Sequence, residues 1–196
     1  MSYDPTVLPP GLPVPEDDGA ASHLAGRLVP PLRLETTHGE LNLATAAAEL
    51  LVLYVYPRTG KPGVEPPRTW DETPGARGCT PQSCGFRDHG EELRALGATV
   101  LGLSAQTRDD QRELAERLGL AHAVAADPEL RLADALRLPT FEFDGRRLYK
   151  RLTLVAEEGR IVKVFYPVFP PDENAAEVAA WLRASRARTL VRGSEA

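Results

Sequence analysis

Leu50-Leu51-Val52-Leu53-Tyr54-Val55-Tyr56-Pro57 is a run of seven apolar residues that ends at a proline. Such an unbroken run is typical of a strand that is buried on both faces. Strands of this kind occur where helices cover both sides of a largely parallel sheet. The run therefore predicts the central strand of an α/β protein.

The segments around this run alternate between strands and helices. The first long helix is expected to have Thr80 as its N-cap and Pro81 at its first position, where a missing N–H has no cost. This order predicts a thioredoxin-like fold, with a central mixed β-sheet flanked by helices and an N-terminal β-hairpin extension. We expect hairpins at residues 32–43, 141–150 and 152–166, strands at 99–104 and 123–126, and helices at about 80–96, 107–118, 130–136 and 173–186.

Proline marks two segments that we expect to have little regular structure. Residues 1–31 hold seven prolines and form a Pro-rich leader, which is expected to be solvated or loosely packed. Residues 57–78 hold five more and form a long loop before the cysteines. A loop of this length in a compact domain is usually functional. Residues 32–190, with this loop as an insertion, are predicted to form one domain.

The charge and hydropathy patterns exclude several classes of protein. Acidic and basic residues are mixed along the chain and the formal net charge is −5, so we expect neither a nucleic-acid nor a membrane surface. No apolar run reaches the roughly 18 residues of a membrane-spanning helix. The N-terminus lacks the basic start and apolar run of a secretory signal. A cytoplasmic location is therefore expected.

Both cysteines of the chain lie in Gly78-Cys79-Thr80-Pro81-Gln82-Ser83-Cys84-Gly85-Phe86-Arg87-Asp88. Paired cysteines in cytosolic proteins are usually catalytic, redox-sensing or metal-binding. A helix N-terminus and nearby cations lower the pKa of a thiol and make it nucleophilic. Cys79 lies just before the expected N-cap, with Arg77 and Arg87 close in sequence. Cys79 is therefore the candidate nucleophile, and Cys84, inside the helix, is its candidate partner.

Other interpretations of the two cysteines stay open at this stage. They could be two small buried hydrophobic side chains, or the dithiol of a thioredoxin-type oxidoreductase, although that class has two residues between its cysteines instead of four. A metal site is disfavoured because the spacing departs from Cys-x₂-Cys and the four histidines are dispersed. In one regular helix the two Cα atoms would lie roughly 8 Å apart and point about 140° away from each other. A disulfide would therefore require local unwinding.

The cysteine segment resembles the signature G-C-T-x-Q-x-C-x-x-R-D of the Q-type peroxiredoxins, also called bacterioferritin comigratory proteins, in the alkyl hydroperoxide reductase and thiol-specific antioxidant superfamily. In that family the signature follows a strand that ends in Tyr-Pro, as at Tyr56-Pro57 here. A later strand with an arginine is similar to Arg151-Leu152-Thr153-Leu154-Val155. The likeness covers about residues 32–182.

The resemblance implies a thioredoxin-dependent peroxidase that reduces hydrogen peroxide and small organic hydroperoxides. Cys79 matches the peroxidatic cysteine, Cys84 the resolving cysteine that forms an intramolecular disulfide, and Arg151 the arginine that steadies the thiolate and polarises the peroxide. A thioredoxin or glutaredoxin-like donor would reduce the disulfide. No cofactor is implied, and a cysteine pair within one chain favours a monomer.

One departure from the family concerns the substrate site. The family places a proline seven residues and a threonine three residues before the peroxidatic cysteine. Here Pro57 lies 22 residues upstream of Cys79, and the position three before Cys79 is Ala76. Pro57 remains a candidate substrate-binding residue. The candidates for the missing hydroxyl are Thr73 first, and then Thr59, Thr69 and Thr80.

Two other functions fit the same residues. The first is a disulfide reductase on the same fold, which would show little peroxide turnover. The second is a non-enzymatic redox sensor or interaction module whose cysteine pair oxidises as a signal. In that case the Pro-rich leader and the residue 57–78 loop would be docking surfaces.

Overall fold

The predicted central strand is β3 (Leu50–Val55), and each of its six side chains is buried. The computed structural model describes residues 3–193, and side chains through residue 187. β3 pairs in parallel with β4 (Ala98–Ser104) and antiparallel with β8 (Leu152–Glu157). The strand is thus hydrogen-bonded on both edges, as expected for a fully apolar run.

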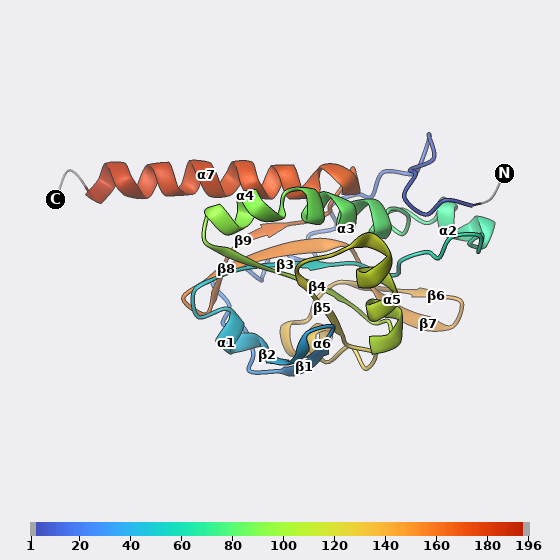
Figure 1. Ribbon diagram of the computed structural model, residues 1–196, viewed down its shortest axis with the longest axis horizontal. Coiled ribbons are helices and arrows are strands. Elements are labelled where there is room, and N and C mark those ends of the chain that lie inside the picture. Colours follow the sequence, from blue (N-terminus) through green and yellow to red (C-terminus); the bar gives the residue numbers. More distant parts are fainter. Residues whose placement is uncertain (1–2, 194–196) are drawn as a thin grey trace.

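The full sheet has seven strands in the order β2-β1-β5-β4-β3-β8-β9 (Figure 1). It is mixed, because β4 and β5 are also parallel whereas the outer pairs are antiparallel. The hairpin β6–β7 forms a separate two-stranded ribbon. The remaining strands are β1 (Arg33–Thr36), β2 (Gly39–Asn42), β5 (Ala123–Ala126), β6 (Thr140–Phe143), β7 (Arg146–Tyr149) and β9 (Arg160–Phe165).

Helices cover both faces of the sheet, which confirms the predicted α/β architecture. In Figure 1, α7 and the α3–α4 segment lie above the sheet, and α1 and α6 lie below it. No helix among residues 3–193 is long and apolar enough to cross a membrane. The helices are α1 (Leu43–Ala46), α2 (Arg68–Glu72), α3 (Cys79–Asp88), α4 (Gly90–Ala95), α5 (Arg108–Leu118), α6 (Arg131–Leu136), η1 (Pro171–Glu173) and α7 (Asn174–Gly193).

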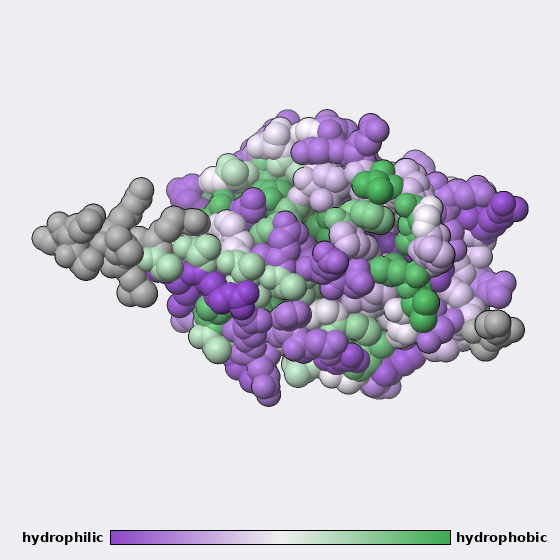
Figure 2. Space-filling view, turned by 90° about the horizontal axis from the view of Figure 1, so that it is seen from above, coloured by the Kyte–Doolittle hydropathy of each residue, from purple (hydrophilic) through white to green (hydrophobic). Residues whose placement is uncertain are grey.

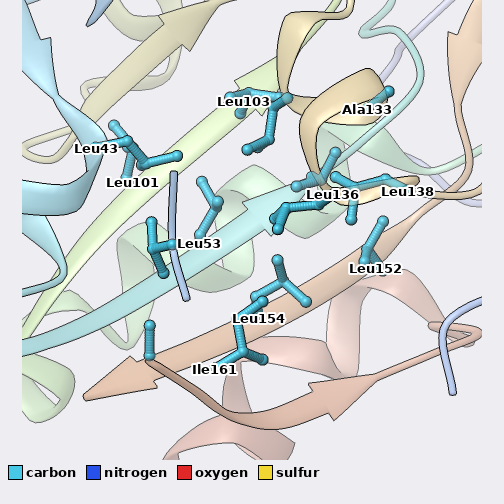
Figure 3. Close-up of a cluster of buried hydrophobic side chains, with 14 of the residues drawn as sticks. Leu43, Leu53, Leu101, Leu103, Ala133, Leu136, Leu138, Leu152, Leu154 and Ile161 are labelled. Atoms are coloured by element: carbon cyan, nitrogen blue, oxygen red, sulfur yellow. The ribbon is translucent and has the colours of Figure 1, made fainter. Parts of the chain in front are cut away.

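Alternation along β3 divides the core into two layers. Leu51, Leu53 and Val55 join the cluster under α1 and α6, part of which Figure 3 shows. Val52 and Tyr54 join the cluster under α3, α4, α5 and α7, which also contains the Cys79 side chain. Successive strand residues point to opposite faces, so β3 anchors both layers and one of them carries the cysteine.

Local sequence signals were reliable where a short motif fixes the backbone. Thr107 and Asp110 form the predicted capping box of α5, and Gly119 ends that helix in a left-handed conformation. The predicted β6–β7 turn has Asp144 and Gly145 at positive φ, as a two-residue hairpin turn requires. The N-terminal hairpin is β1–β2, with Thr36 opposite Gly39.

Two predictions about the first long helix are wrong. Gly78, not Thr80, is the N-cap, and the helix begins at Cys79 because the Gln82 N–H already bonds the Gly78 carbonyl. Pro81 is the third helical residue, where its missing N–H still has no intrahelical partner to lose. The helix also does not run to residue 96, because His89 leaves helical geometry and separates α3 from α4.

The two Pro-rich segments are more ordered than expected. The residue 57–78 segment contains α2, whose Trp70 side chain is buried. Leader residues from 3 onward have little regular structure, as predicted, and most of them are exposed or half-buried, but residues 21–29 contribute to the core. Leu24 is fully buried, and Ala21 and Val29 join the same core layer. Leu28 also forms an isolated bridge with Arg160 of β9. The domain boundary at residue 31 stays a prediction.

Replacing Leu24 by alanine tests this packing. We expect Leu24→Ala to lower the free energy of unfolding by about 2–5 kcal/mol, the usual cost of a cavity at a buried leucine. Val7→Ala in the same leader should change it by less than about 0.5 kcal/mol, because Val7 is 58% exposed. Urea unfolding measures both. Equal small effects would show that the leader does not contribute to the core.

Candidate active site

Cys79 lies at the N-terminus of α3, directly after a backbone turn that requires glycine. Gly78 has a φ of 100°, and a side chain there would collide with Pro171. The Cys79 side chain is 2% exposed, and its Sγ lies 3.6 Å from the Ala76 carbonyl oxygen. The sulfur is thus held where the unpaired N–H groups of the first helical turn give a positive potential.

Arg151, which directly precedes β8, brings a positive charge to this sulfur. Its Nη2 lies 3.2 Å from Cys79 Sγ, and its side chain is 3% exposed. The described residues include no carboxylate partner for Arg151. At low local dielectric, this guanidinium attracts negative charge on the sulfur. Nη2 also donates to the carbonyl oxygens of Gly75, Ala76 and Arg77 at 3.2, 3.2 and 2.9 Å.

Behind Arg151 is a group of hydrogen-bonded polar residues that sequence reasoning missed. Arg151 Nη1 donates to Gln82 Oε1 at 2.6 Å, and Gln82 Nε2 donates to Asn174 Oδ1 at 3.0 Å. Thr153 Oγ1 donates to the same Asn174 oxygen at 2.7 Å. Gln82 belongs to the cysteine signature, so the sequence did single out this position, although not its contacts. Asn174 carries no comparable signal, because it lies 92 residues from Gln82.

Cys84 is also in α3, half-buried, and is not bonded to Cys79. Desolvation by burial raises the pKa of the Cys84 thiol, the Arg87 charge opposes this rise, and the Asp88 charge adds to it. The two cysteines lie in one continuous helix, five residues apart. Their Cα atoms are therefore about 8 Å apart, beyond the usual disulfide range.

The two arginines expected to act on Cys79 have other roles. The Arg77 guanidinium is paired with Asp71 at 3.1 Å and lies over the Tyr3 ring. Arg87 bonds the Asp88 carboxylate and the Leu118 carbonyl oxygen. Its charge acts on Cys84. Among these residues, the positive charge in contact with Cys79 Sγ therefore comes from Arg151.

A cavity of about 740 Å³ lies beside Cys79 and Thr80. The residue 57–78 segment forms much of its wall, and the β6–β7 ribbon forms another part. The Arg58 guanidinium lies 4.5 Å from the centre of the Trp70 ring and 5.7 Å from that of Phe143. Stacking of this kind holds an arginine against aromatic rings. The cavity therefore combines apolar surface and positive charge next to the thiol.

Of the candidate threonines, Thr59 and Thr80 line the cavity of Cys79, whereas the first candidate, Thr73, does not. The Thr73 hydroxyl donates to the Thr69 carbonyl oxygen at 2.7 Å, and Thr73 lines a second pocket together with Arg151. Thr59 lines the cavity of Cys79, and its N–H and hydroxyl both donate to Gln106 Oε1. Thr80 lines it too, and its buried hydroxyl has no protein partner.

Two further positions complete the comparison with the sequence predictions. Pro57 is buried directly before the cavity-lining Arg58, but it does not line the cavity itself. Ala76 is fully buried and has no hydroxyl to offer. Within residues 3–193, no group of three or more His, Cys, Asp or Glu side chains is arranged to hold a metal ion.

The fold and the site together define a class of protein. A thiol at a helix N-terminus and a mixed sheet covered by helices are features of thioredoxin-fold redox proteins. The Redoxin sequence profile matches residues 24–180. The chain belongs to the Redoxin family.

Individual relatives agree with this assignment. The chain is 28% identical to Peroxiredoxin Bcp of Bacillus subtilis over 76% of its own length and 89% of the relative's. It is 26% identical to the chloroplastic Peroxiredoxin Q of Sedum lineare, covering 93% and 90%. The solved Peroxidoxin BcpB of Mycobacterium tuberculosis matches with a TM-score of 0.67 at 24% identity, covering 83% and 98%. The predicted thioredoxin-like fold and the resemblance to Q-type peroxiredoxins are confirmed.

The protonation of Cys84 gives a pH-dependent prediction. In a Cys79→Ser variant, iodoacetamide should alkylate Cys84 with a midpoint above the ordinary thiol value of about 8.5, because burial raises its pKa. The alkylation rate therefore rises with pH and stays low near neutrality. In denaturant the midpoint should fall back to the ordinary value. A folded-state midpoint at or below that value would contradict the assignment.

Proposed function

We propose that this protein is a thiol-dependent peroxidase in which Cys79 attacks the peroxide, Cys84 resolves the product and Arg151 assists the attack. The observation that carries the proposal is the 3.2 Å contact between Arg151 Nη2 and Cys79 Sγ beside an open cavity. Buried arginines usually have carboxylate partners. An arginine directed at a sulfur serves a chemical purpose that a packed cysteine would not need.

In the first step the Cys79 thiolate attacks the terminal oxygen of a hydroperoxide. The O–O bond breaks and the terminal oxygen stays on the sulfur, which becomes a sulfenic acid. The other oxygen leaves as an alkoxide, or as hydroxide from hydrogen peroxide, and takes up the proton that the thiol released on ionising, which gives an alcohol or water. Arg151 stabilises the anionic sulfur before the attack and donates to the oxygen that gains charge during it. The first-turn N–H groups of α3 contribute in the same sense.

In the second step the Cys84 thiol condenses with the sulfenic acid. A sulfur–sulfur bond forms and one water molecule leaves. α3 has to unwind between the two cysteines, because their helical spacing exceeds disulfide geometry. A thioredoxin or glutaredoxin-like donor then reduces the disulfide by thiol–disulfide exchange, which regenerates both thiols.

The cavity supports hydrogen peroxide and small organic hydroperoxides as substrates. Trp70, Phe143 and Leu148 supply apolar surface for an organic group, whereas hydrogen peroxide requires only the polar groups at the sulfur. Because the chemistry uses two thiols and an arginine, it requires no metal or other cofactor.

We further propose a cytoplasmic monomer that uses neither a membrane nor a nucleic acid. The cysteine pair lies within one chain, so catalysis does not need a second subunit. On the face that carries α7, hydrophobic groups are separated by hydrophilic side chains (Figure 2). The net charge of −5 disfavours binding to nucleic acid or anionic lipid.

Two cysteine variants test the assignment of roles. Cys79→Ser should abolish peroxide consumption, because the nucleophile is gone. Cys84→Ser should complete one fast turnover and then stall as a sulfenic acid or overoxidise. Stopped-flow peroxide consumption and mass spectrometry of the Cys79 peptide report both. Loss of the first turnover in both variants would contradict the roles. Insulin reduction without peroxide turnover would indicate a disulfide reductase, and a single oxidation that no thioredoxin reverses would indicate a sensor.

Arg151 variants test the electrostatic part of the proposal. Arg151→Met should slow the oxidation of Cys79 by roughly 100-fold, a usual loss when a transition-state donor is removed. Arg151→Lys should recover only part of the rate, since it keeps the charge but loses the planar fork. Arg112→Met, on the exposed surface of α5, is the matched control. Oxidation of Arg151→Met at the normal rate would overturn this role.

A further inference from the structure

The catalytic cycle makes two opposing demands on α3. Peroxide attack uses the closed helix, in which Cys79 is its first residue and lies against Arg151. Disulfide formation needs the same helix to open, because the helical spacing holds the two cysteines out of bonding range. Contacts that exist only when α3 is closed therefore influence how readily the helix opens.

Gln82 provides such contacts from a position between the two cysteines. It accepts from Arg151 Nη1 at 2.6 Å and donates to Asn174 Oδ1 at 3.0 Å. Gln82 is fully buried, so these bonds form away from solvent. When α3 unwinds, Gln82 has to leave both partners. Buried hydrogen bonds of this kind oppose the opening, because breaking them leaves polar groups unpaired.

Asn174 and Thr153 hold the outer end of this group. Asn174 is the first residue of α7 and is 1% exposed, and Thr153 lies in β8 and is fully buried. The Thr153 hydroxyl donates to Asn174 Oδ1 at 2.7 Å and so fixes the amide that receives Gln82. Neither residue lines the Cys79 cavity. The hydrogen bonds of this pair reach α3 through Gln82.

We propose that Thr153 and Asn174 form a latch that holds α3 closed through Gln82 and thereby sets the balance between disulfide formation and overoxidation of Cys79. The inference rests on the proposed peroxidase function. It assigns to two residues outside the cavity a positioning role that changes the fate of the intermediate.

The balance is between two reactions of the same sulfenic acid. In one, the Cys84 thiol attacks the Cys79 sulfur, a disulfide forms and water leaves. In the other, a second hydroperoxide transfers one oxygen to the Cys79 sulfur, which becomes a sulfinic acid while the hydroperoxide is reduced to its alcohol. Only the first reaction needs α3 to open. A tighter latch therefore favours overoxidation, and a weaker latch favours the disulfide.

Thr153→Val removes the latch hydroxyl while keeping the shape of the side chain. Disulfide formation after a single peroxide pulse should become about 2- to 10-fold faster, the range expected from one hydrogen bond of typical strength. The peroxide concentration that converts half of Cys79 to sulfinic acid during turnover should rise by a similar factor. Thr153→Ser keeps the hydroxyl and should behave like the unmodified protein in both assays.

The matched control is Thr36→Val. Thr36 is also a buried strand threonine whose hydroxyl donates at 2.7 Å, but it lies in the β1–β2 hairpin away from α3. It should leave both readouts unchanged. Amide exchange of the reduced protein adds a second measurement: Thr153→Val should speed the exchange of α3 amides and leave those of α5 unaffected.

The possible outcomes separate this inference from the function on which it rests. Absence of peroxide turnover in the unmodified protein would reject the function itself. Normal turnover, with Thr153→Val resolving at the unmodified rate, would overturn the latch alone. A slower oxidation of Cys79 with an unchanged ratio of disulfide to sulfinic acid would also overturn it, because the group would then only orient Arg151.

Discussion

The buried guanidinium of Arg151 is the group on which the arrangement of the site depends. It joins the last residues of the 57–78 segment, the first turn of α3 and the strand β8 through donors to three carbonyl oxygens, Gln82 and Cys79 Sγ. A buried charge without compensation is costly. The carbonyl oxygens, Gln82 Oε1 and Cys79 Sγ that accept from the guanidinium offset this cost. The contacts that stabilise the buried arginine thus also place its charge against the Cys79 sulfur.

α3 is fixed in place by close backbone packing, one polar side chain and one aromatic contact. Gly78 and Gly85 allow it to approach η1 closely, since a side chain at either position would meet Pro171 or the Asp172 backbone. Gln82 adds a polar attachment between the two cysteines. Behind α3, Phe86 stacks on Tyr54 of the central strand at 4.3 Å between ring centres. Both cysteines thus belong to a short helix that packs against the central sheet through Phe86 and against η1 through Gly78 and Gly85.

Much of the fold could be predicted because its signals are local. The apolar run of β3, the capping box of Thr107 and Asp110, and the Asp144-Gly145 turn each restrict a few neighbouring residues. The N-cap of α3 was misplaced by two residues, because the close approach of Pro171 to Gly78 is a contact between distant segments. The buried leader was missed for the same reason, since Leu24 has no partner near it in sequence. The place of Thr73 could not be read from the sequence either, because the fold puts it in a second pocket with Arg151 while its hydroxyl bonds within its own turn of helix.

By itself, the sequence determined the α/β class and singled out the two cysteines, because residue types and short spacings carry that information. Arg151 was singled out only by the resemblance to a known family. Only the tertiary structure decided that the Arg151 charge reaches Cys79 Sγ and that the 57–78 segment lines a cavity there. It also decided that Asn174 and Thr153 are hydrogen-bonded to each other and to Gln82. These outcomes depend on distances between segments far apart along the chain. Such distances are set by how the whole core packs, and no local pattern encodes them.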